Sequence, residues 1–287
     1  MIHTVRFENF RCLREVELTL EPLTVLVGPQ ASGKTAVLDG LDLQPGCNVT
    51  DFWRQDESLR ATVEWRYDNG RRTRTQYPLM SMDSTPMQTH ALQALALDVV
   101  ALREDTSPGR STVLNRTGDN LSGVFAALAP GPRQRVVEEL CRLVPTVAAV
   151  EVQATSPRTQ RLRFRDRWRE DLWFAPDKVG DTALLLLGYL VLPYQKPPPD
   201  IITLDMPERG LAPWLLGDLM ALLRRLTTGE QGGNPIQVVL ATSAPEVLEY
   251  VAPTEVRVLS RSPEDGAVRV SASPADVADW RQRLAMT

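Results

Sequence analysis

One octapeptide limits the possible folds of this chain more than any other feature. Residues 28–35 read Gly-Pro-Gln-Ala-Ser-Gly-Lys-Thr and match the pattern G-x-x-x-x-G-K-[ST] at every required position. The apolar run 23–27 precedes this segment, and a helix-compatible stretch begins at Ala36. A strand, a glycine-rich loop and a helix in this order are the context that the pattern requires, which disfavours a chance match. We therefore predict an α/β fold built around a phosphate loop at residues 28–35.

The residue types of the phosphate loop suit an anion. Gly28 and Gly33 leave the backbone N–H groups accessible, and the start of the following helix adds a positive partial charge. Lys34 can reach the β- and γ-phosphate oxygens, and the Thr35 hydroxyl can complete the coordination of Mg²⁺. The predicted phosphate-binding residues are Gly28, Pro29, Gln30, Ala31, Ser32, Gly33, Lys34 and Thr35. The sequence thus predicts binding of a nucleoside triphosphate with Mg²⁺.

Composition narrows the class of protein further. The chain has 287 residues, of which 43% are hydrophobic and 24% are charged, as in ordinary globular proteins. A formal net charge of −4 supplies no global basic field that would attract nucleic acid or an anionic membrane, although local basic patches remain possible. No apolar run approaches the roughly 18 residues of a membrane helix, and residues 1–6 lack the apolar core of a signal peptide. We expect a cytoplasmic protein without a membrane partner.

Cysteine and histidine usage argues against disulfides and protein-built zinc sites. The three cysteines, Cys12, Cys47 and Cys141, lie far apart, and their number is odd. The two histidines, His3 and His90, have no second candidate ligand close in sequence.

Alternating hydrophobicity predicts strands at residues 2–10, 13–20 and 23–27. We expect these three to form a small antiparallel group that leads into the phosphate loop. Two further strands, at residues 59–65 and 72–77, flank the hairpin turn 68–70. The chain then reaches a Pro-rich break at residues 197–199. The elements expected before this break are strands at 99–102, 147–152 and 161–164, a loop at 105–119, and helices at 120–128, 132–143 and 182–192.

The C-terminal third alternates strands and helices, which indicates a mostly parallel sheet with crossover helices. The expected elements are strands at 201–205, 237–242 and 255–259 and helices at 214–226 and 245–250. We therefore predict an α/β fold with a mostly parallel sheet, an N-terminal antiparallel β group and an inserted α/β subdomain. We expect residues 1–287 to form a single head, with the insertion at about 50–170.

Asp205 is the candidate for the second half of the site. A phosphate loop needs a partner carboxylate to hold the metal, usually at the end of another central strand. Asp205 ends the apolar run 201–204. The alternative role is a helix N-cap at a strand–helix turn. We predict that Thr35 and Asp205 hold the metal.

Four segments resemble the RecF/SMC/OLD-like branch of the ABC-type ATPases, the compact predicted AAA-family ATPases of bacterial genomes. These segments are residues 7–11 (FENFR), 118–121 (GDNL), 205–211 (DMPERGL) and 237–245. The resemblance implies ATP rather than GTP, and a head-to-tail closure of two copies with ATP between one copy's phosphate loop and the other's signature loop. It also implies a phosphate contact for Arg11, whose alternative is a surface arginine in a turn.

The chain departs from the family pattern at the hydrolysis residues. Met206 stands where the family has its general-base glutamate, and a thioether cannot accept a proton from water. Ser243 stands where the family has its switch histidine, and Ala212 replaces another histidine. Residues 178–182 (KVGDT) align best with the signature loop but lack its serine. We name them the signature-like segment, in which Gly180 and Thr182 retain hydrogen-bonding groups.

The preserved phosphate loop and the altered hydrolysis residues together favour a nucleotide-gated head with weak or partner-dependent hydrolysis. The resemblance places such a head in DNA repair or anti-phage defence. One alternative is a fully active ATPase that uses Glu208 as its general base, although a carboxylate here is also typical of a first helical turn. Another is a scaffold subunit that nucleotide merely stabilises.

Partners follow from the resemblance and from what the chain lacks. We expect a homodimer or an ATP-dependent head-to-tail assembly, and a separately encoded effector such as a nuclease. No sustained heptads occur between Thr35 and Gly180, where related repair ATPases carry coiled-coil arms. The arginine-rich stretch 158–169, with Trp168, is a candidate nucleic-acid surface, but interspersed acidic residues favour a solvated hairpin.

Overall fold

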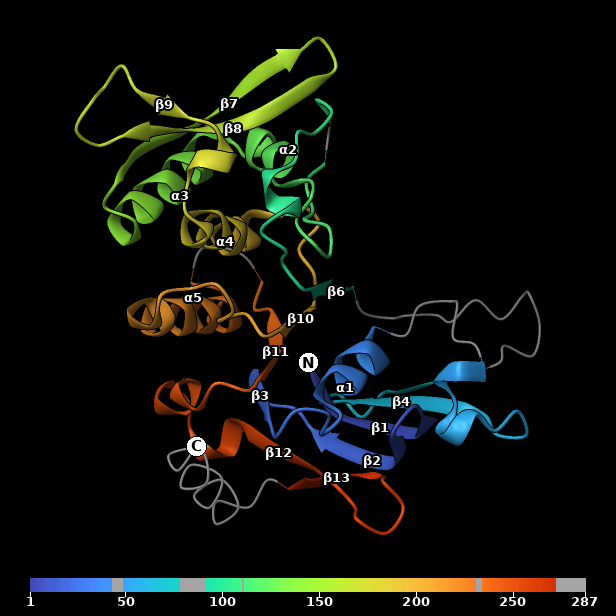
Figure 1. The fold of residues 1–287 in the computed structure, drawn as a ribbon. Helices are drawn as coiled ribbons and strands as arrows, with labels where there is room; N and C mark the ends of the chain where they lie inside the picture. Colours follow the sequence, from blue (N-terminus) through green and yellow to red (C-terminus); the bar gives the residue numbers. More distant parts are fainter. Residues whose placement is uncertain (43–48, 78–90, 110, 231–233, 272–287) are drawn as a thin grey trace. The chain divides into compact units, whose positions relative to one another are not determined.

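The computed structural model describes residues 1–42, 49–77, 91–109, 111–230 and 234–271 (Figure 1). The chain divides into two compact units, both of which are discontinuous in sequence. Unit 1 comprises residues 1–94, 200–207 and 236–287, and unit 2 comprises residues 95–199 and 208–235. The prediction of one head with an insertion at about 50–170 stays a prediction. Cys47 and His90 lie outside the described residues.

Unit 1 contains an antiparallel sheet with the strand order β2-β1-β4-β5. Its strands are β1 (Ile2–Phe10), β2 (Leu13–Thr19), β4 (Ala61–Tyr67) and β5 (Arg72–Tyr77). Burial alternates along β2, where Val16 and Leu18 are buried and their neighbours are exposed. This alternation leaves one face of the sheet for the core and the other for solvent.

The second sheet of unit 1 has the order β13-β12-β3-β11-β10-β6, and β12, β3, β11 and β10 are parallel. Its strands are β3 (Leu23–Val27), β6 (Leu92–Leu95), β10 (Ile201–Asp205), β11 (Gln237–Thr242), β12 (Val256–Arg261) and β13 (Val268–Ser271), the last antiparallel to β12. All side chains of β3 and β11 are buried, as expected for central parallel strands.

Helix α1 (Lys34–Leu41) contacts β10 and β11 of the parallel sheet and β1 of the antiparallel sheet. Its Gly40 approaches β1 closely, because a Cβ there would lie 2.7 Å from Cε1 of Phe7. The helix that follows the phosphate loop is therefore packed into the core of unit 1.

Unit 2 combines an antiparallel sheet, β7-β8-β9, with a set of helices. Its elements are α2 (Leu121–Ala127), α3 (Pro130–Leu143), β7 (Val147–Ser156), β8 (Thr159–Asp166), β9 (Trp173–Phe174), α4 (Asp181–Leu190) and α5 (Leu216–Thr228). Helix α3 packs on β7 and α4, and α4 packs on α5 (Figure 1). Every side chain from Ala183 to Leu190 is buried, so α4 is the central helix of the unit.

Short 3₁₀ helices connect these elements. They are η1 (Val49–Asp51), η2 (Trp53–Gln55), η3 (Ala101–Arg103), η4 (Pro176–Lys178), η5 (Leu192–Tyr194), η6 (Pro213–Leu215), η7 (Pro245–Tyr250) and η8 (Pro253–Glu255).

The predicted fold class is confirmed: the protein is α/β, with a mostly parallel sheet and antiparallel strands. The expectation that residues 23–27 join the antiparallel group is wrong, because β3 pairs in parallel with β11 and β12. All five residues of β3 are buried, without the alternation of buried and exposed side chains that a half-exposed strand shows. This pattern is typical of a strand that is covered on both faces.

The expected strand at 99–102 is also wrong. The strand of this region is β6, and residues 101–103 form η3. The Asp98 carboxylate accepts hydrogen bonds from the N–H groups of Val100 and Ala101, which favours a turn, and the Val100 side chain is exposed. The expected helix 245–250 is the 3₁₀ helix η7.

Candidate nucleotide-binding site

The phosphate loop connects β3 to α1 within unit 1. Gly28 has a φ of 155° and Gly33 a φ of 102°, a region that L side chains rarely adopt. A Cβ at Gly28 would lie 2.3 Å from the carbonyl oxygen of Leu259, and one at Gly33 would lie 2.5 Å from Cγ2 of Val268. Both positions require glycine for conformation and for space, so the loop can curl tightly before α1 begins.

Two polar side chains converge on this loop. Lys34 is buried, and its Nζ donates hydrogen bonds to the carbonyl oxygens of Gly28 (2.7 Å) and Pro29 (3.0 Å). Ser32 is also buried, and its hydroxyl has no hydrogen-bond partner among the described residues. A buried hydroxyl without a partner inside a glycine-rich cradle is a donor that an anion would satisfy.

Thr35 and Asp205 lie together although 170 residues separate them in sequence. Thr35 Oγ1 donates a hydrogen bond to Asp205 Oδ2 at 3.2 Å. Strands β3 and β10 flank β11 in the parallel sheet, so their carboxyl ends lie at the same edge. Asp205 Oδ1 is buried and accepts no hydrogen bond from the described part of the chain.

This donor set fits Mg²⁺. Within the described ranges, no group of three or more His, Cys, Asp or Glu side chains could hold a metal ion by itself. Mg²⁺ typically takes one or two protein oxygens and completes its shell with phosphate and water. The Thr35 hydroxyl and the remaining Asp205 oxygen match that pattern, so the residues present fit a magnesium–phosphate group.

Arg11 follows β1 and is held by two carboxylates. Its guanidinium lies 2.6 Å from Asp39 Oδ2 and 2.9 Å from Asp51 Oδ1. Partial burial opposes its charge, but the hydrogen bonds to Asp51 and Asp39 outweigh burial and raise the pKa of Arg11. The structure thus places Arg11 in a double ion pair in unit 1, and its contact with phosphate stays a prediction.

A cavity of about 350 Å³ lies beside Arg11 in the same unit. Its walls include Arg11, Cys12, Trp53, Arg54, Gln55 and Arg261. Cys12 connects this cavity to the phosphate loop, because its Sγ lies 3.2 Å from where a Gly33 Cβ would be. The Arg54 guanidinium lies 5.3 Å from the centroid of the Trp53 ring. Sequence reasoning missed Trp53 and Arg54, since no motif includes them.

Backbone strain is concentrated around these features. In the described part of the chain, the non-glycine residues with positive φ are Asn9, Arg11, Ala31, Arg54, Gln55 and Met206. Arg11, Arg54 and Gln55 line the cavity, Ala31 is in the phosphate loop, and Met206 follows Asp205. Such conformations cost about 1–3 kcal/mol each and tend to occur at functional sites.

The predicted hydrolysis positions are divided between the two units. Met206 is held by a hydrogen bond from its N–H to the carbonyl oxygen of Ala241, with a φ of 48°. Ser243 is exposed just after β11. Glu208 belongs to unit 2, where burial and then the Glu208 charge raise the pKa of Tyr189 on α4.

The signature-like segment is also in unit 2, where it leads into α4 and includes the first two residues of this helix. Gly180 is the N-cap of this helix, and Thr182 Oγ1 donates to the carbonyl oxygen of Gly210 at 3.3 Å. A Cβ at Gly180 would have no neighbour within 4 Å, so the segment presents an open backbone.

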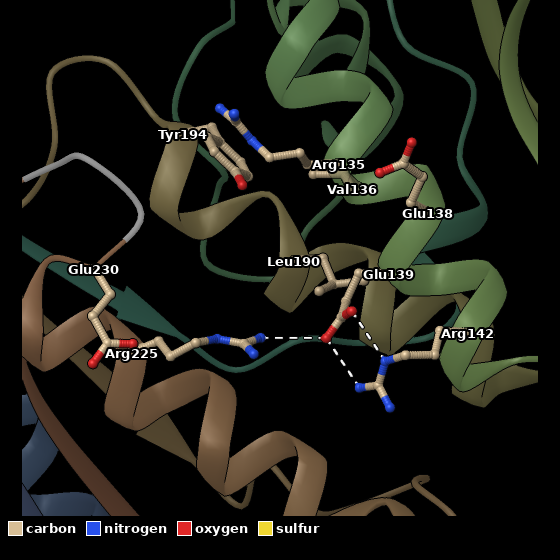
Figure 2. A pocket seen from close by; sticks show the side chains of 9 residues that line it. All are labelled: Arg135, Val136, Glu138, Glu139, Arg142, Leu190, Tyr194, Arg225 and Glu230. Atoms are coloured by element: carbon tan, nitrogen blue, oxygen red, sulfur yellow. Dashed lines mark hydrogen bonds and ion pairs between the residues drawn. The ribbon is translucent and has the colours of Figure 1, made fainter.

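A second cavity, of about 550 Å³, contains none of the predicted site residues. It lies in unit 2 between α3 and α5, with Tyr194 and Leu190 at its side (Figure 2). Glu139 lies at its centre, 3.0 Å from Arg142 and 3.4 Å from Arg225. The hydrogen bonds from Arg142, opposed by partial burial, lower the pKa of Glu139. This network ties α3 to α5 and gives the cavity a structural role.

The arginine-rich stretch 158–169 comprises part of the turn after β7, strand β8 and the residues that follow it, and much of its charge is paired. Arg161 lies 2.9 Å from Asp105, and Arg163 lies 2.7 Å from Glu151 and over the Trp173 ring. No helix in the described ranges is long and apolar enough to cross a membrane.

Comparison with known proteins agrees with this geometry. Residues 1–44 match the model of the AAA ATPase domain family. A stretch of 60 residues is 42% identical to an OLD nuclease from Thermus scotoductus (strain ATCC 700910 / SA-01). That match covers 21% of this chain and 11% of the nuclease, so the chain corresponds to a small part of that protein.

Solved structures resemble the chain over nearly its full length. An SMC head bound to the C-terminal winged-helix domain of ScpA has a TM-score of 0.63 at 11% identity, covering 94% of this chain and 96% of that one. The SMC head domain from Thermotoga maritima has a TM-score of 0.53 at 13% identity, covering 94% and 98%.

An SMC head with an extended coiled coil, bound to the C-terminal domain of ScpA derived from Pyrococcus furiosus, has a TM-score of 0.59 at 10% identity, covering 100% of this chain and 99% of that one. These likenesses show that the chain has the fold of the SMC head domains. The RecF/SMC/OLD-like resemblance expected from the sequence is therefore confirmed.

Proposed function

We propose that this protein is an ATP–Mg²⁺-binding head that dimerises or signals on nucleotide binding and hydrolyses ATP slowly or only with a partner. The observation that carries this proposal is the convergence of Lys34, Ser32 and the Thr35–Asp205 pair at one edge of the parallel sheet. The same strand end carries Met206 in place of a general base.

Nucleotide binding rests on the phosphate loop. Its backbone N–H groups and the buried Lys34 ammonium would hold the phosphates, and Ser32 Oγ would donate a further hydrogen bond. Mg²⁺, when bound between Thr35 and Asp205, would neutralise charge on the phosphate oxygens. The chain's own contribution is to fix these groups before the ligand arrives.

The cavity beside Arg11 is suited to the nucleoside end of the ligand. Cys12 lines it and backs the phosphate loop, so one nucleotide would extend from the loop into the cavity. The exposed Arg54 guanidinium, which lies over the buried Trp53 ring, provides a flat surface on which a base would stack. Stacking tolerates different bases, and we therefore expect only modest discrimination between ATP and GTP.

Weak hydrolysis follows from the chemistry of Met206. A thioether cannot take a proton from the attacking water, and loss of a general base typically costs about 10²–10⁴-fold in rate. The backbone of Met206 is held by Ala241, which keeps this side chain, and not a carboxylate, next to the predicted metal ligand Asp205. Phosphate binding uses other residues and should survive.

The cellular role and partners are proposed from likeness. The OLD nuclease and the ScpA-bound SMC heads suggest work on DNA, in repair or in defence against foreign DNA, in the cytoplasm. Two copies would close head to tail, with nucleotide between the phosphate loop of one and the signature-like segment of the other. A separately encoded nuclease would respond to the closed state. A direct nucleic-acid contact has no support from the net charge of −4.

The alternative function is a fully active ATPase with Glu208 as general base, and the specific observation in its favour is a carboxylate two residues after Met206. A scaffold that nucleotide only stabilises is the non-enzymatic alternative. It predicts the same oligomeric state with and without ATP.

Calorimetry and turnover measurements test the proposal. Purified protein should bind ATP–Mg²⁺ and turn over below about 0.01 s⁻¹, compared with 1–10³ s⁻¹ for typical enzymes. Lys34→Ala should weaken binding by about 100-fold or more, whereas Lys196→Ala, at an exposed lysine of unit 2 outside the signature-like segment, is the matched control. Turnover of several per second that Lys34→Ala abolishes would contradict weak hydrolysis, and absence of any ATP binding would contradict the whole proposal.

A further inference from the structure

Arg103 in unit 2 donates four hydrogen bonds from one side chain. Its guanidinium donates to the carbonyl oxygens of Val99 (2.9 Å), Pro176 (3.2 Å) and Val179 (3.0 Å), and to Asp181 Oδ1 (2.7 Å). The side chain is 24% exposed. Arg103 is the last residue of η3 and lies more than 70 residues before the segment that it contacts. No sequence motif includes Arg103.

The acceptors lie on both sides of Gly180. Val179 and Asp181 are its two neighbours, and one nitrogen, Nη2, donates to both. Gly180 itself is exposed, and its N-cap geometry opens the first turn of α4 to solvent. The planar Arg103 guanidinium thus holds the backbone on both sides of Gly180, while the side of Gly180 where a Cβ would stand is open.

The local backbone gives this segment little support of its own. Lys178 N–H donates to the Ala175 carbonyl at 3.0 Å, and Val179 N–H reaches the Pro176 carbonyl only at 3.4 Å. A single 3₁₀ turn of this kind is weak, because its hydrogen-bond geometry is poor. The contacts with Arg103 therefore add side-chain hydrogen bonds on both sides of Gly180, which the local turn does not supply.

The charge of Arg103 is balanced by the ion pair with Asp181. A neutralised guanidinium is poorly suited to bind phosphate itself, but well suited to hold a neighbouring backbone. We propose that Arg103 is the positioning residue of the signature-like segment. It holds Gly180 and the start of α4 in the arrangement that a second copy's nucleotide would meet.

This inference rests on the proposed head-to-tail assembly, and it explains how a degenerate signature remains usable. Without the serine that the family pattern has, the segment offers mainly backbone N–H groups and the Thr182 hydroxyl. Backbone donors bind an anion well only when they are fixed beforehand, since ordering them during association weakens it. Arg103 provides that fixation in the absence of nucleotide.

Hydrogen exchange on the full chain without nucleotide tests the fixation directly. Arg103→Gln should speed exchange of peptides covering residues 176–184 by about tenfold or more, with Arg103→Lys intermediate, because one ammonium cannot serve both sides of Gly180. Arg163→Gln is the matched control, since Arg163 pairs with Glu151 on the neighbouring strand. Unchanged exchange in 176–184 would overturn the inference.

Two further readouts separate positioning from general destabilisation. Arg103→Gln should leave the dissociation constant for ATP–Mg²⁺ within about twofold, since that site is in unit 1, and should weaken ATP-dependent dimerisation by about tenfold or more. Dimerisation at the wild-type level despite faster exchange would overturn the functional part of the inference. If the wild-type protein binds ATP and stays monomeric, the proposed assembly fails, and the exchange data alone decide whether Arg103 holds the segment.

Discussion

Gly33 shows how a single residue serves both conformation and space. Its φ of 102° places it in the region where a Cβ is strained, and Val268 and Cys12 occupy the volume that a side chain would need. As the N-cap of α1 it also directs the first turn toward the loop. The fold of the loop therefore requires glycine at position 33 even without a bound ligand.

Gly33→Ala should lower stability by about 2 kcal/mol or more, because backbone strain of about 1–3 kcal/mol adds to the contact with Val268. Denaturant unfolding measures the loss. Gly131→Ala is the control, since Gly131 is in the first turn of α3 and a Cβ there meets nothing within 4 Å. Equal stability of the two variants would contradict this account of the loop.

The Thr35–Asp205 pair gives a second prediction at the scale of the residue. Thr35→Ala and Asp205→Asn should each weaken ATP binding in the presence of Mg²⁺ by about 10–100-fold, as expected for loss of a charged contact worth about 1.5–3 kcal/mol. Without Mg²⁺ the variants and the wild type should bind alike. Calorimetry with and without Mg²⁺ measures both, and Asp68→Asn, at the ion pair with the N-terminus, is the control. A loss of similar size without Mg²⁺ would argue against a metal role.

At the scale of elements, the order of the strands brings the site together. The carboxyl ends of β3 and β10 meet because β11 lies between them and all three run parallel. In unit 2 the elements are joined by packing and by a charge network: Arg142 contacts both Glu139 on its own helix and Asp218 on α5.

Glu139 connects α3 to α5, and its pKa makes this connection dependent on pH. Hydrogen bonds from Arg142 lower the pKa of Glu139 below its usual 4.5. The contribution of Glu139 to the free energy of unfolding is therefore fully present above pH 4.5 and is lost as the pH falls through the lower pKa of the folded state. Glu139→Gln should cost about 1 kcal/mol or less at pH 7, because the pair is partly solvated, and the difference from wild type should shrink below about pH 4. Urea unfolding at both pH values checks this. Glu138→Gln is the control, since the Glu138 carboxylate accepts a hydrogen bond from Gln134 on the same helix. A difference that persists at low pH would contradict the assignment.

At the scale of the whole molecule, the chain crosses between its units beside the predicted site. Asp205 and Met206 belong to unit 1, and Glu208 and the signature-like segment belong to unit 2. The proposed assembly therefore depends on groups from both units.

Light scattering coupled to gel filtration should show only a monomer in the presence of ADP, and both a monomer and a dimer in the presence of ATP–Mg²⁺. Under the proposed function, Glu208→Gln changes the dimer fraction by less than about twofold, because Glu208 is not the base. Under the alternative it traps the dimer and abolishes turnover. A trapped dimer would replace the proposed function by the active ATPase, and identical profiles with ADP and ATP would favour the scaffold.

The sequence by itself determined the local features of this protein. The phosphate loop was predictable because its motif consists of eight consecutive residues, and most strands and helices were predictable from periodicity. Asp205 could be chosen as the partner of Thr35 because parallel strands present their carboxyl ends at one edge.

Only the tertiary structure decided which distant residues meet. The place of β3 in the parallel sheet depends on strand pairing. The cavity beside Cys12 depends on a hairpin more than 240 residues away in the sequence. The proposed role of Arg103 depends on acceptors 73–78 residues further along the chain. Contacts of this kind leave no periodicity in the sequence, because each involves one side chain and backbone atoms that any residue carries. They arise when folding fixes the backbone, which is why the positioning of the site becomes visible only in three dimensions.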